Sequence, residues 1–196
     1  MSKPRGRPNQ GQGICQADIL DTALDLLEAG GNTGLTMRSL ASRLGVTPMS
    51  LYNHVEDRVD LLRKISDRVY SDVAHDNDPA DDSPEPLRLL LTRYFSAVAR
   101  YPQLTLAIFT EPQAFAGVTR KISDRLTELL EPLTPEPSLW RDILVDHAHG
   151  CGIALALSSA ACGQVDKASL QAQYSLALDR LLARIRSDKV PLQSNG

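Results

Sequence analysis

The amino-acid sequence predicts an all-α protein, with a small N-terminal helical domain followed by a larger C-terminal helical domain. Apolar residues recur at the three- and four-residue spacing of amphipathic helices along most of the chain, and prolines and glycines separate these runs. No segment shows the alternating pattern of a strand. With 196 residues, of which 42% are hydrophobic, the chain can bury a core as one or two domains.

The first two helices are predicted from apolar spacing and from the residues that end each run. Residues 17–29 carry an apolar stripe and are followed by Gly30 and Gly31, which end the helix. Thr36 can cap a second helix over residues 37–44. Gly45 then supplies the left-handed conformation found after a helix C-terminus. The inward positions of this second helix are Met37, Leu40, Ala41 and Leu44.

A third, short helix is predicted directly after this turn. Thr47 can cap it, and Pro48 occupies the first helical position, where a missing N–H costs nothing. Leu51 and Val55 point inward. The polar and aromatic residues left on the other face have little core to form and favour contact with base edges and phosphates of DNA: Met49, Ser50, Tyr52, Asn53 and His54. We therefore predict a helix-turn-helix, with a merely structural helical hairpin as the alternative.

The segment LTMRSLASRLGVTPMSLYNHV, residues 35–55, resembles the DNA-binding domain of the TetR family of bacterial repressors. The resemblance extends from about Ile19 to Leu62 and covers roughly the first third of the chain. It implies that residues 47–53 face the major groove and that Arg38, Tyr52, His54 and Arg58 contact the phosphate backbone. The full set of candidate DNA-binding residues in the helical domain is Thr36, Arg38, Thr47, Pro48, Met49, Ser50, Tyr52, Asn53, His54 and Arg58.

The distribution of charge agrees with DNA binding better than the net charge does. The formal net charge is −3, but residues 1–10 carry three basic side chains and no acid, whereas residues 76–85 carry five acids and no base. The segment Pro4-Arg5-Gly6-Arg7-Pro8 resembles the core of an AT-hook. That resemblance implies that Arg5 and Arg7 enter an A·T minor groove. The alternative is a solubilising basic tail.

The remaining helices form the predicted C-terminal domain. A long helix begins near Asp57, with a spine of Leu62, Ile65, Val69 and Val73, and an acidic, proline-containing loop follows at 75–86. Further helices are predicted after Ser83-Pro84 and over residues 103–109, 113–130, 138–161 and 167–187. We expect a flexible basic arm at 1–13, the DNA-binding domain at 14–60, a ligand-binding and dimerisation domain at 61–187, and a tail at 188–196.

The family resemblance also implies two properties of the C-terminal domain. The last two long helices, about 138–161 and 167–187, pair with their copies in a homodimer. The middle helices enclose a cavity for a small-molecule effector whose identity the sequence does not give. The residues on those helices that are candidates for ligand contact, with ordinary core packing as the alternative for each, are Tyr94, Phe95, Phe109, Phe115, Trp140, His147 and Cys151.

No residue cluster in the sequence predicts catalysis, a cofactor or a metal site. His147 and Cys151 of the segment DHAHGC share a helical face, but His149 points nearly opposite, so only two of the four ligands of a structural zinc converge. No nucleophile motif or phosphate-binding glycine loop is present. We therefore expect no enzyme, no cofactor and no metal.

The cellular setting follows from the cysteines and from hydropathy. The three cysteines, Cys15, Cys151 and Cys162, are odd in number and far apart, which favours reduced thiols in the cytoplasm. No signal peptide or span of 18 apolar residues occurs, so no membrane contact is expected.

Together these features predict a cytoplasmic, homodimeric transcriptional repressor that binds a palindromic operator and is released by a small molecule. One alternative is a regulator that senses redox state through Cys15 or Cys151, which requires an exposed thiol of low pKa. Another is an all-α binding protein or enzyme in which the helical pair is only structural.

Overall fold

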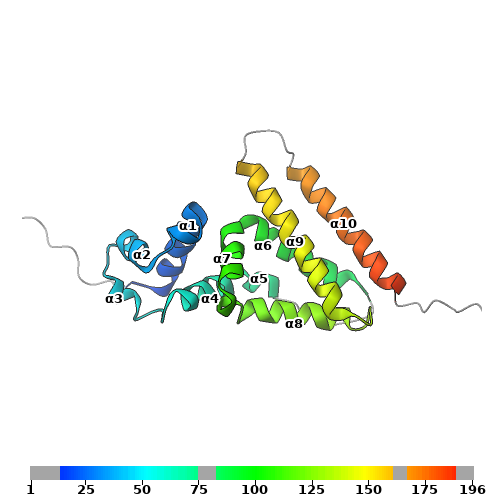
Figure 1. Ribbon diagram of the computed structural model, residues 1–196, viewed down its shortest axis with the longest axis horizontal. Helices are drawn as coiled ribbons and strands as arrows, with labels where there is room; N and C mark the ends of the chain where they lie inside the picture. The colour runs from blue at the N-terminus through cyan, green and yellow to red at the C-terminus, as the bar shows by residue number, and fades with distance from the viewer. Residues whose placement is uncertain (1–13, 75–82, 161–166, 189–196) are drawn as a thin grey trace, which may run out of the picture.

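The protein is helical throughout the residues that the computed structural model describes, which are 14–74, 83–160 and 167–188. Figure 1 shows the first helices of the chain at one end of an elongated molecule and the two longest helices, α9 (Pro137–Ala160) and α10 (Lys167–Asp188), side by side at the other. Between these two ends lie α4 (Arg58–Val69) and the helices formed by residues 71–130. The predicted fold class, an N-terminal helix-turn-helix followed by a larger helical domain, is confirmed.

The first helix, α1 (Gln16–Gly34), is interrupted at Gly31, which has φ +60° and ψ −162°. Ile19, Ala23 and Leu27 are fully buried along its inner face. The predicted end of the helix at Gly30-Gly31 therefore corresponds to a kink, after which the chain continues for a further helical turn. Gly31 allows this kink because it can adopt a positive φ without steric cost.

The second and third helices, α2 (Met37–Leu44) and α3 (Pro48–Leu51), form where the capping residues predicted them. The Thr36 hydroxyl accepts from the Ser39 backbone N–H, and the Ser39 hydroxyl accepts from the Thr36 N–H, which makes a reciprocal capping box. Gly45 is left-handed, at φ +69° and ψ +31°. Leu51 and Val55 are buried, which confirms their inward orientation.

The fourth helix, α4 (Arg58–Val69), is shorter than the sequence predicted. Tyr70 ends it, and a separate turn, α5 (Ser71–Ala74), carries Val73 into the core. The apolar spacing of Leu62, Ile65 and Val73 is preserved across the break, so periodicity alone could not reveal it. Val69 is only half-buried. Asp57 caps the helix by accepting from the Asp60 N–H at 2.8 Å.

The middle of the molecule consists of α6 (Glu85–Arg100), α7 (Pro102–Thr110), the short 3-10 turn η1 (Pro112–Ala114) and α8 (Val118–Leu130). Helix α8 starts five residues later than predicted, because Gly117 has φ +58° and breaks the helical path. The described part of the predicted acidic loop at 75–86 is limited to residues 83–86; its aspartates lie outside the described residues.

The last two helices are α9 (Pro137–Ala160) and α10 (Lys167–Asp188), close to their predicted bounds. Helix α9 packs extensively on α6 as well as on α10. Gly152 allows this approach, since a Cβ there would lie 2.7 Å from a Val98 methyl carbon. Helix α10 buries Tyr174, Leu178, Leu182 and Ile185 along one face.

Candidate functional site: a helix-turn-helix surface and an aromatic cavity

The outer face of the helix-turn-helix is exposed and carries large side chains. Met49 is 75% exposed and Tyr52 is 48% exposed, which is unusual for residues of this size in a globular protein. Buried Leu51 anchors the helix beneath them. Ser50 and His54 are half-buried. The remaining predicted DNA-binding residues on this surface are exposed: Thr36, Arg38, Thr47, Pro48 and Asn53.

The charge of this surface favours an anionic partner. Residues 36–55 contain two arginines, Arg38 and Arg43, and no acidic residue. Both arginines lie exposed on α2. The Thr47 side chain accepts from the Ser50 N–H at 3.3 Å, so its hydroxyl holds the start of α3 in place. A pre-formed helix start next to basic side chains is suited to a phosphate backbone. Arg5 and Arg7 lie outside the described residues.

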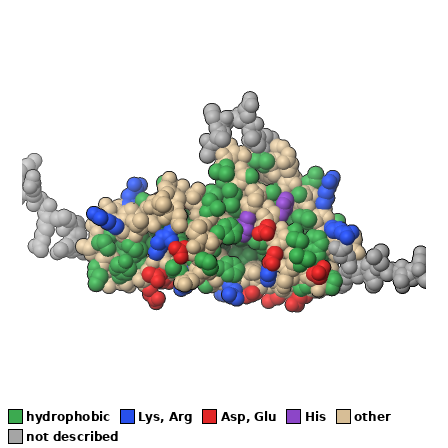
Figure 2. Space-filling view, viewed as in Figure 1, with side chains coloured by type: hydrophobic (Ala, Val, Ile, Leu, Met, Phe, Trp, Pro, Cys, Tyr) green, Lys and Arg blue, Asp and Glu red, His purple; other side chains and the backbone are tan. Residues whose placement is uncertain are grey.

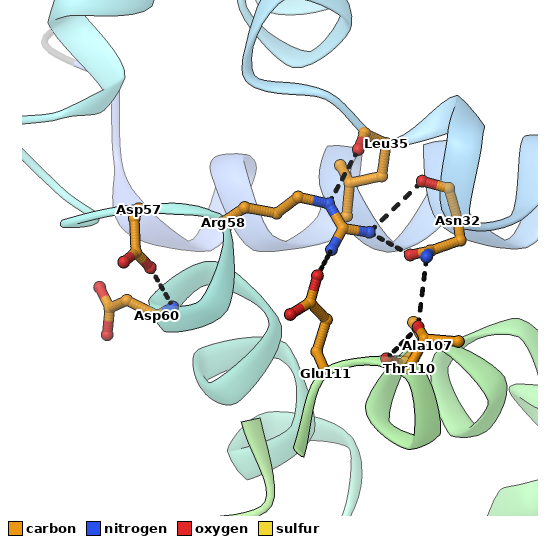
Figure 3. A network of polar contacts seen from close by, with 8 residues as sticks. All are labelled: Asn32, Leu35, Asp57, Arg58, Asp60, Ala107, Thr110 and Glu111. Carbon is orange, nitrogen blue, oxygen red and sulfur yellow. Dashed lines mark hydrogen bonds and ion pairs between the residues drawn. The ribbon is translucent and has the colours of Figure 1, made fainter. Parts of the chain in front are cut away.

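Arg58 is placed differently from the other predicted phosphate contacts. Its guanidinium is directed inward, where Nε donates to the Leu35 carbonyl at 3.3 Å and Nη1 forms an ion pair with Glu111 at 3.2 Å. Nη2 donates to the Asn32 carbonyl and side chain. Figure 3 shows this network, with Asn32 also donating to the Thr110 hydroxyl. Arg58 thus connects α1 and α4 to the segment between α7 and η1.

A cavity of about 460 Å³ lies between α6, α7, α8 and α9. This volume is within the usual range of small-molecule sites, which is about 300–1,000 Å³. Its walls are mainly apolar and aromatic. Figure 2 shows a hollow in the middle of the molecular face that is turned to the viewer, with hydrophobic side chains in it and acidic and histidine side chains nearby. The lining residues are Tyr70, Tyr94, Thr105, Ile108, Phe109, Pro112, Phe115, Thr119, Ile122, Ser123, Leu126, Arg141, Asp142, Val145, Asp146 and His149.

The cavity has a buried floor and an exposed mouth. Tyr70, Thr105 and Leu126 are almost completely buried, whereas Phe109 is 55% exposed and Phe115 is 43% exposed. Asp142 and Asp146 are also exposed. The Tyr70 hydroxyl is bonded to the Thr105 hydroxyl at 2.9 Å, and burial raises the pKa of Tyr70 to about 12. The floor is therefore uncharged at neutral pH.

His149 forms the polar wall of the cavity together with Tyr94. The Tyr94 hydroxyl lies 2.6 Å from His149 Nε2. The Phe109 ring meets the imidazole edge-on, with 4.8 Å between the two ring centroids. Burial lowers the pKa of His149, although the nearby Asp146 carboxylate opposes the shift. Burial likewise raises the pKa of Tyr94 far above its ordinary value. Both groups are neutral at pH 7, and the pair can accept a hydrogen bond or donate one.

The structure divides the predicted ligand-contact residues into two groups. Tyr94, Phe109 and Phe115 line the cavity. Phe95 and His147 instead stack on the ring of Tyr174, at centroid distances of 3.9 and 5.3 Å, and Cys151 lies 3.7 Å from His147 Nδ1. Trp140 packs against the core outside the cavity. One helical face of α6 and α9 thus serves the cavity and the adjacent face contacts α10.

Several cavity residues were not identified from the sequence. Tyr70, at the end of α4, and Thr105, on α7, form the floor, and the break in the helix at Tyr70 was not revealed by periodicity. Asp142, Asp146 and His149 line the wall from one face of α9. The helical spacing predicted that His149 and His147 point in opposite directions. This was the feature of the sequence from which the position of His149 at the cavity could have been inferred.

Two carboxylates connect the cavity helices to the DNA-binding helices. Glu28, near the end of α1, accepts from the Gln103 and Leu104 N–H groups at 3.3 and 2.9 Å and so caps α7. Burial raises the pKa of Glu28, partly offset by these hydrogen bonds. Asp67 of α4 accepts from the Val118 N–H at 2.7 Å at the start of α8. The cavity walls α7 and α8 are therefore both tied to the helices that carry the helix-turn-helix.

The two cysteines among the described residues differ in exposure: Cys15 is exposed and Cys151 is half-buried. Burial raises the pKa of Cys151, which disfavours the reactive thiolate. The Cys15 sulfur accepts from the Asp18 N–H at 3.4 Å at the start of α1. No group of three metal-ligating side chains converges within the described ranges. Helices long and apolar enough to cross a membrane are absent from the same ranges.

Comparison with known proteins places the N-terminal helices in a family. Residues 19–65 match the model of the bacterial regulatory proteins of the tetR family. A relative from Mycobacterium tuberculosis, named as an uncharacterized HTH-type transcriptional regulator (Rv0681), is 35% identical over a match that covers 35% of this chain and 35% of the relative. The matched part of the chain thus spans about a third of the length of that relative.

Solved structures are similar to the chain over most of its length. BioQ from Mycobacterium smegmatis superposes with a TM-score of 0.71 at 20% identity, covering 89% of this chain and 99% of BioQ. A structure of BioQ with its double-stranded DNA operator gives 0.65 at 20% identity, covering 89% and 99%. A TetR variant from Acinetobacter baumannii in complex with minocycline gives 0.68 at 19% identity, covering 90% and 99%. These likenesses establish the fold.

Proposed function

We propose that this chain, which belongs to the TetR family of bacterial regulatory proteins, is a transcriptional repressor that binds a palindromic operator as a homodimer and is released by a small molecule. The exposed helix-turn-helix surface is the observation that carries the DNA-binding part of this proposal. The match of residues 19–65 to bacterial regulatory proteins and the similarity to an HTH-type transcriptional regulator support this proposal over an enzymatic function.

The DNA contacts follow from the geometry of the helix-turn-helix. The start of α3 enters the major groove with Pro48, Met49 and Asn53 toward base edges, while Arg38 on α2 and Tyr52 at the end of α3 contact phosphates. Two copies of α3 occupy successive major grooves, about 34–36 Å apart, on the same side of the duplex. The operator of BioQ, a protein of the same fold, is double-stranded DNA.

The homodimer forms through α9 and α10. Leu139, Ile143 and Leu157 on α9 are exposed, as is Leu176 on α10, with 38–60% of each residue's surface accessible. Four large aliphatic side chains exposed on two adjacent helices are typical of an interface. A second copy related by a two-fold axis would cover them in a four-helix bundle.

The effector acts through the helices that the cavity shares with the DNA-binding domain. Tyr70, at the end of α4, lines the cavity floor, and α7 is bonded to α1 through Glu28 and to α4 through Arg58. A molecule that fills the cavity displaces these elements and changes the separation of the two α3 helices. It releases DNA only if it binds the released state more tightly, by about 5.5 kcal/mol for a complete switch.

Binding to the intergenic DNA beside the gene tests the proposal directly. Fluorescence anisotropy across a salt series should show a dimer whose log K falls steeply with log salt, because phosphate contacts release counterions. If the protein binds unrelated duplexes as tightly as this intergenic DNA, the operator lies elsewhere. Absence of binding at low salt would refute the regulator proposal.

A further inference from the structure

We infer that the cavity takes a monocationic ligand with an apolar or aromatic body, an inference that rests on the proposed effector function of this cavity. The cavity wall contains one guanidinium and two carboxylate side chains: Arg141, Asp142 and Asp146. Because His149, Tyr70 and Tyr94 are neutral there, the formal charge of the wall is −1.

The charges are arranged so that one carboxylate remains for a ligand. Arg141 Nη2 forms an ion pair with Asp142 at 2.7 Å, and Nη1 donates to the Thr127 hydroxyl at 3.2 Å. Asp146 is exposed and takes part in none of the ion pairs found among the described residues, although its carboxylate acts electrostatically on His149. Asp146 lies one helical turn from Asp142 and directly before the turn that carries His149, so it is on the cavity face of α9.

The mouth of the cavity provides the second feature that a cation requires. The exposed rings of Phe109 and Phe115 line the mouth together with Asp146. Aromatic faces attract cations, with an energy of about 0.5–2 kcal/mol depending on desolvation. At Phe115 the Arg120 guanidinium already occupies such a position, 5.9 Å from the ring centroid, so Phe109 and Asp146 are the groups left for a ligand cation.

The floor accounts for the apolar body of the ligand. Ile122, Leu126 and Tyr70 present buried carbon surface. The hydroxyls of Tyr70 and Thr105 satisfy each other, so neither requires a polar ligand group. A ligand with its hydrocarbon part on this floor and its positive charge at the mouth matches these two regions of the cavity. An anionic ligand would place its charge beside the Asp146 carboxylate.

The test compares two molecules of one body and opposite charge. Trimethyl(4-phenylbutyl)ammonium and 4-phenylbutane-1-sulfonate share the phenylbutyl chain and carry compact heads of opposite sign. Isothermal titration of the full chain should give a Kd for the ammonium ion at least about tenfold lower than that for the sulfonate. Asp146→Asn should raise the Kd of the ammonium ion by about three- to tenfold. The sulfonate should not lose affinity.

A matched control separates this effect from the net charge of the protein. Asp124→Asn on α8 removes the same charge from an exposed residue that does not line the cavity, and it should leave both Kd values unchanged. Tighter binding of the sulfonate, equal binding of the two molecules, failure of both to bind, or equal effects of the two substitutions would each overturn the inference. Operator binding by the same preparation, measured in parallel, shows independently whether the regulator proposal stands.

Discussion

The Arg58 guanidinium, at the start of α4, forms an ion pair with the Glu111 carboxylate, 3.2 Å away between α7 and η1. This contact joins the DNA-binding helices to the cavity wall, since Glu111 lies between the lining residues Phe109 and Pro112. The family resemblance implied that Arg58 contacts phosphate. In the present conformation its nitrogen atoms are occupied by Glu111, Asn32 and Leu35, so a phosphate contact would require this network to open.

A double-mutant cycle measures the Arg58–Glu111 contact. Glu111→Gln and Arg58→Met should each lower the free energy of unfolding, and the cycle should give a coupling energy of about 0.5–1 kcal/mol, because both side chains are partly exposed. Urea unfolding of the four proteins provides the values. Additive effects of the two substitutions would show that the ion pair contributes nothing to the stability of this arrangement.

Arg38→Ala and Tyr52→Ala should abolish operator binding while leaving the dimer folded. Arg38 is exposed on α2, so its loss removes a phosphate contact; any binding that remains at low salt should show a slope of log K against log salt that is lower by about 1. Salt-series anisotropy measures this slope. Arg186→Ala, an exposed arginine on α10, is the control and should bind as the unaltered protein does. Retained operator binding by Arg38→Ala, or loss of its dimer, would contradict the assignment.

The exposed leucines of α9 and α10 predict the effect of a charge at the interface. Leu157→Glu should shift the protein toward monomers by about 1–3 kcal/mol or more, because a carboxylate would be buried without a partner in the bundle. Light scattering after size exclusion gives the mass. Leu106→Glu, at a leucine on α7 that is 41% exposed, is the control and should leave the dimer intact. Dimers of the Leu157 variant at low concentration would place the interface elsewhere.

Gly117 should tolerate no side chain. It has φ +58°, and a Cβ there would lie 2.3 Å from the Asp67 carboxylate oxygen that caps α8. Gly117→Ala should therefore destabilise the fold by about 2 kcal/mol or more. Gly30→Ala, in α1, has open space around its Cβ and should be neutral or stabilising by up to about 1 kcal/mol. Equal thermal melting of the two variants would contradict this.

Glu28 predicts a dependence of stability on pH. Its pKa is raised above 4.5 in the folded protein, so folding takes up a proton in mildly acidic solution. The Glu28 contribution to stability therefore becomes more favourable as the pH falls from above its folded pKa toward 4.5. Glu28→Gln does not titrate. Its unfolding free energy relative to the unaltered protein should thus be lower at pH 5 than at pH 7, and the opposite trend in urea unfolding would disprove the assignment.

The sequence by itself determined the helix-turn-helix. Thr36, Gly45, Thr47 and Pro48 act on backbone groups within a few residues, so their effect does not depend on the rest of the fold. The amphipathic stripes were equally local, and they located α6, α9 and α10 to within a few residues. The predicted orientation of His149 away from His147 followed from the same helical geometry.

Tertiary structure decided the rest. The end of α4 at Tyr70 and the late start of α8 at Val118 depend on packing between helices that are far apart in the sequence, including the bond from Asp67 to Val118. The cavity draws its lining from five helical segments, and which of Phe95 and Tyr94 faces it depends on where α10 lies. The inward turn of Arg58 depends on Glu111, which is 53 residues away. Such contacts form only once the helices have assembled, because the local sequence fixes each helix and its faces but not the neighbour that each face meets.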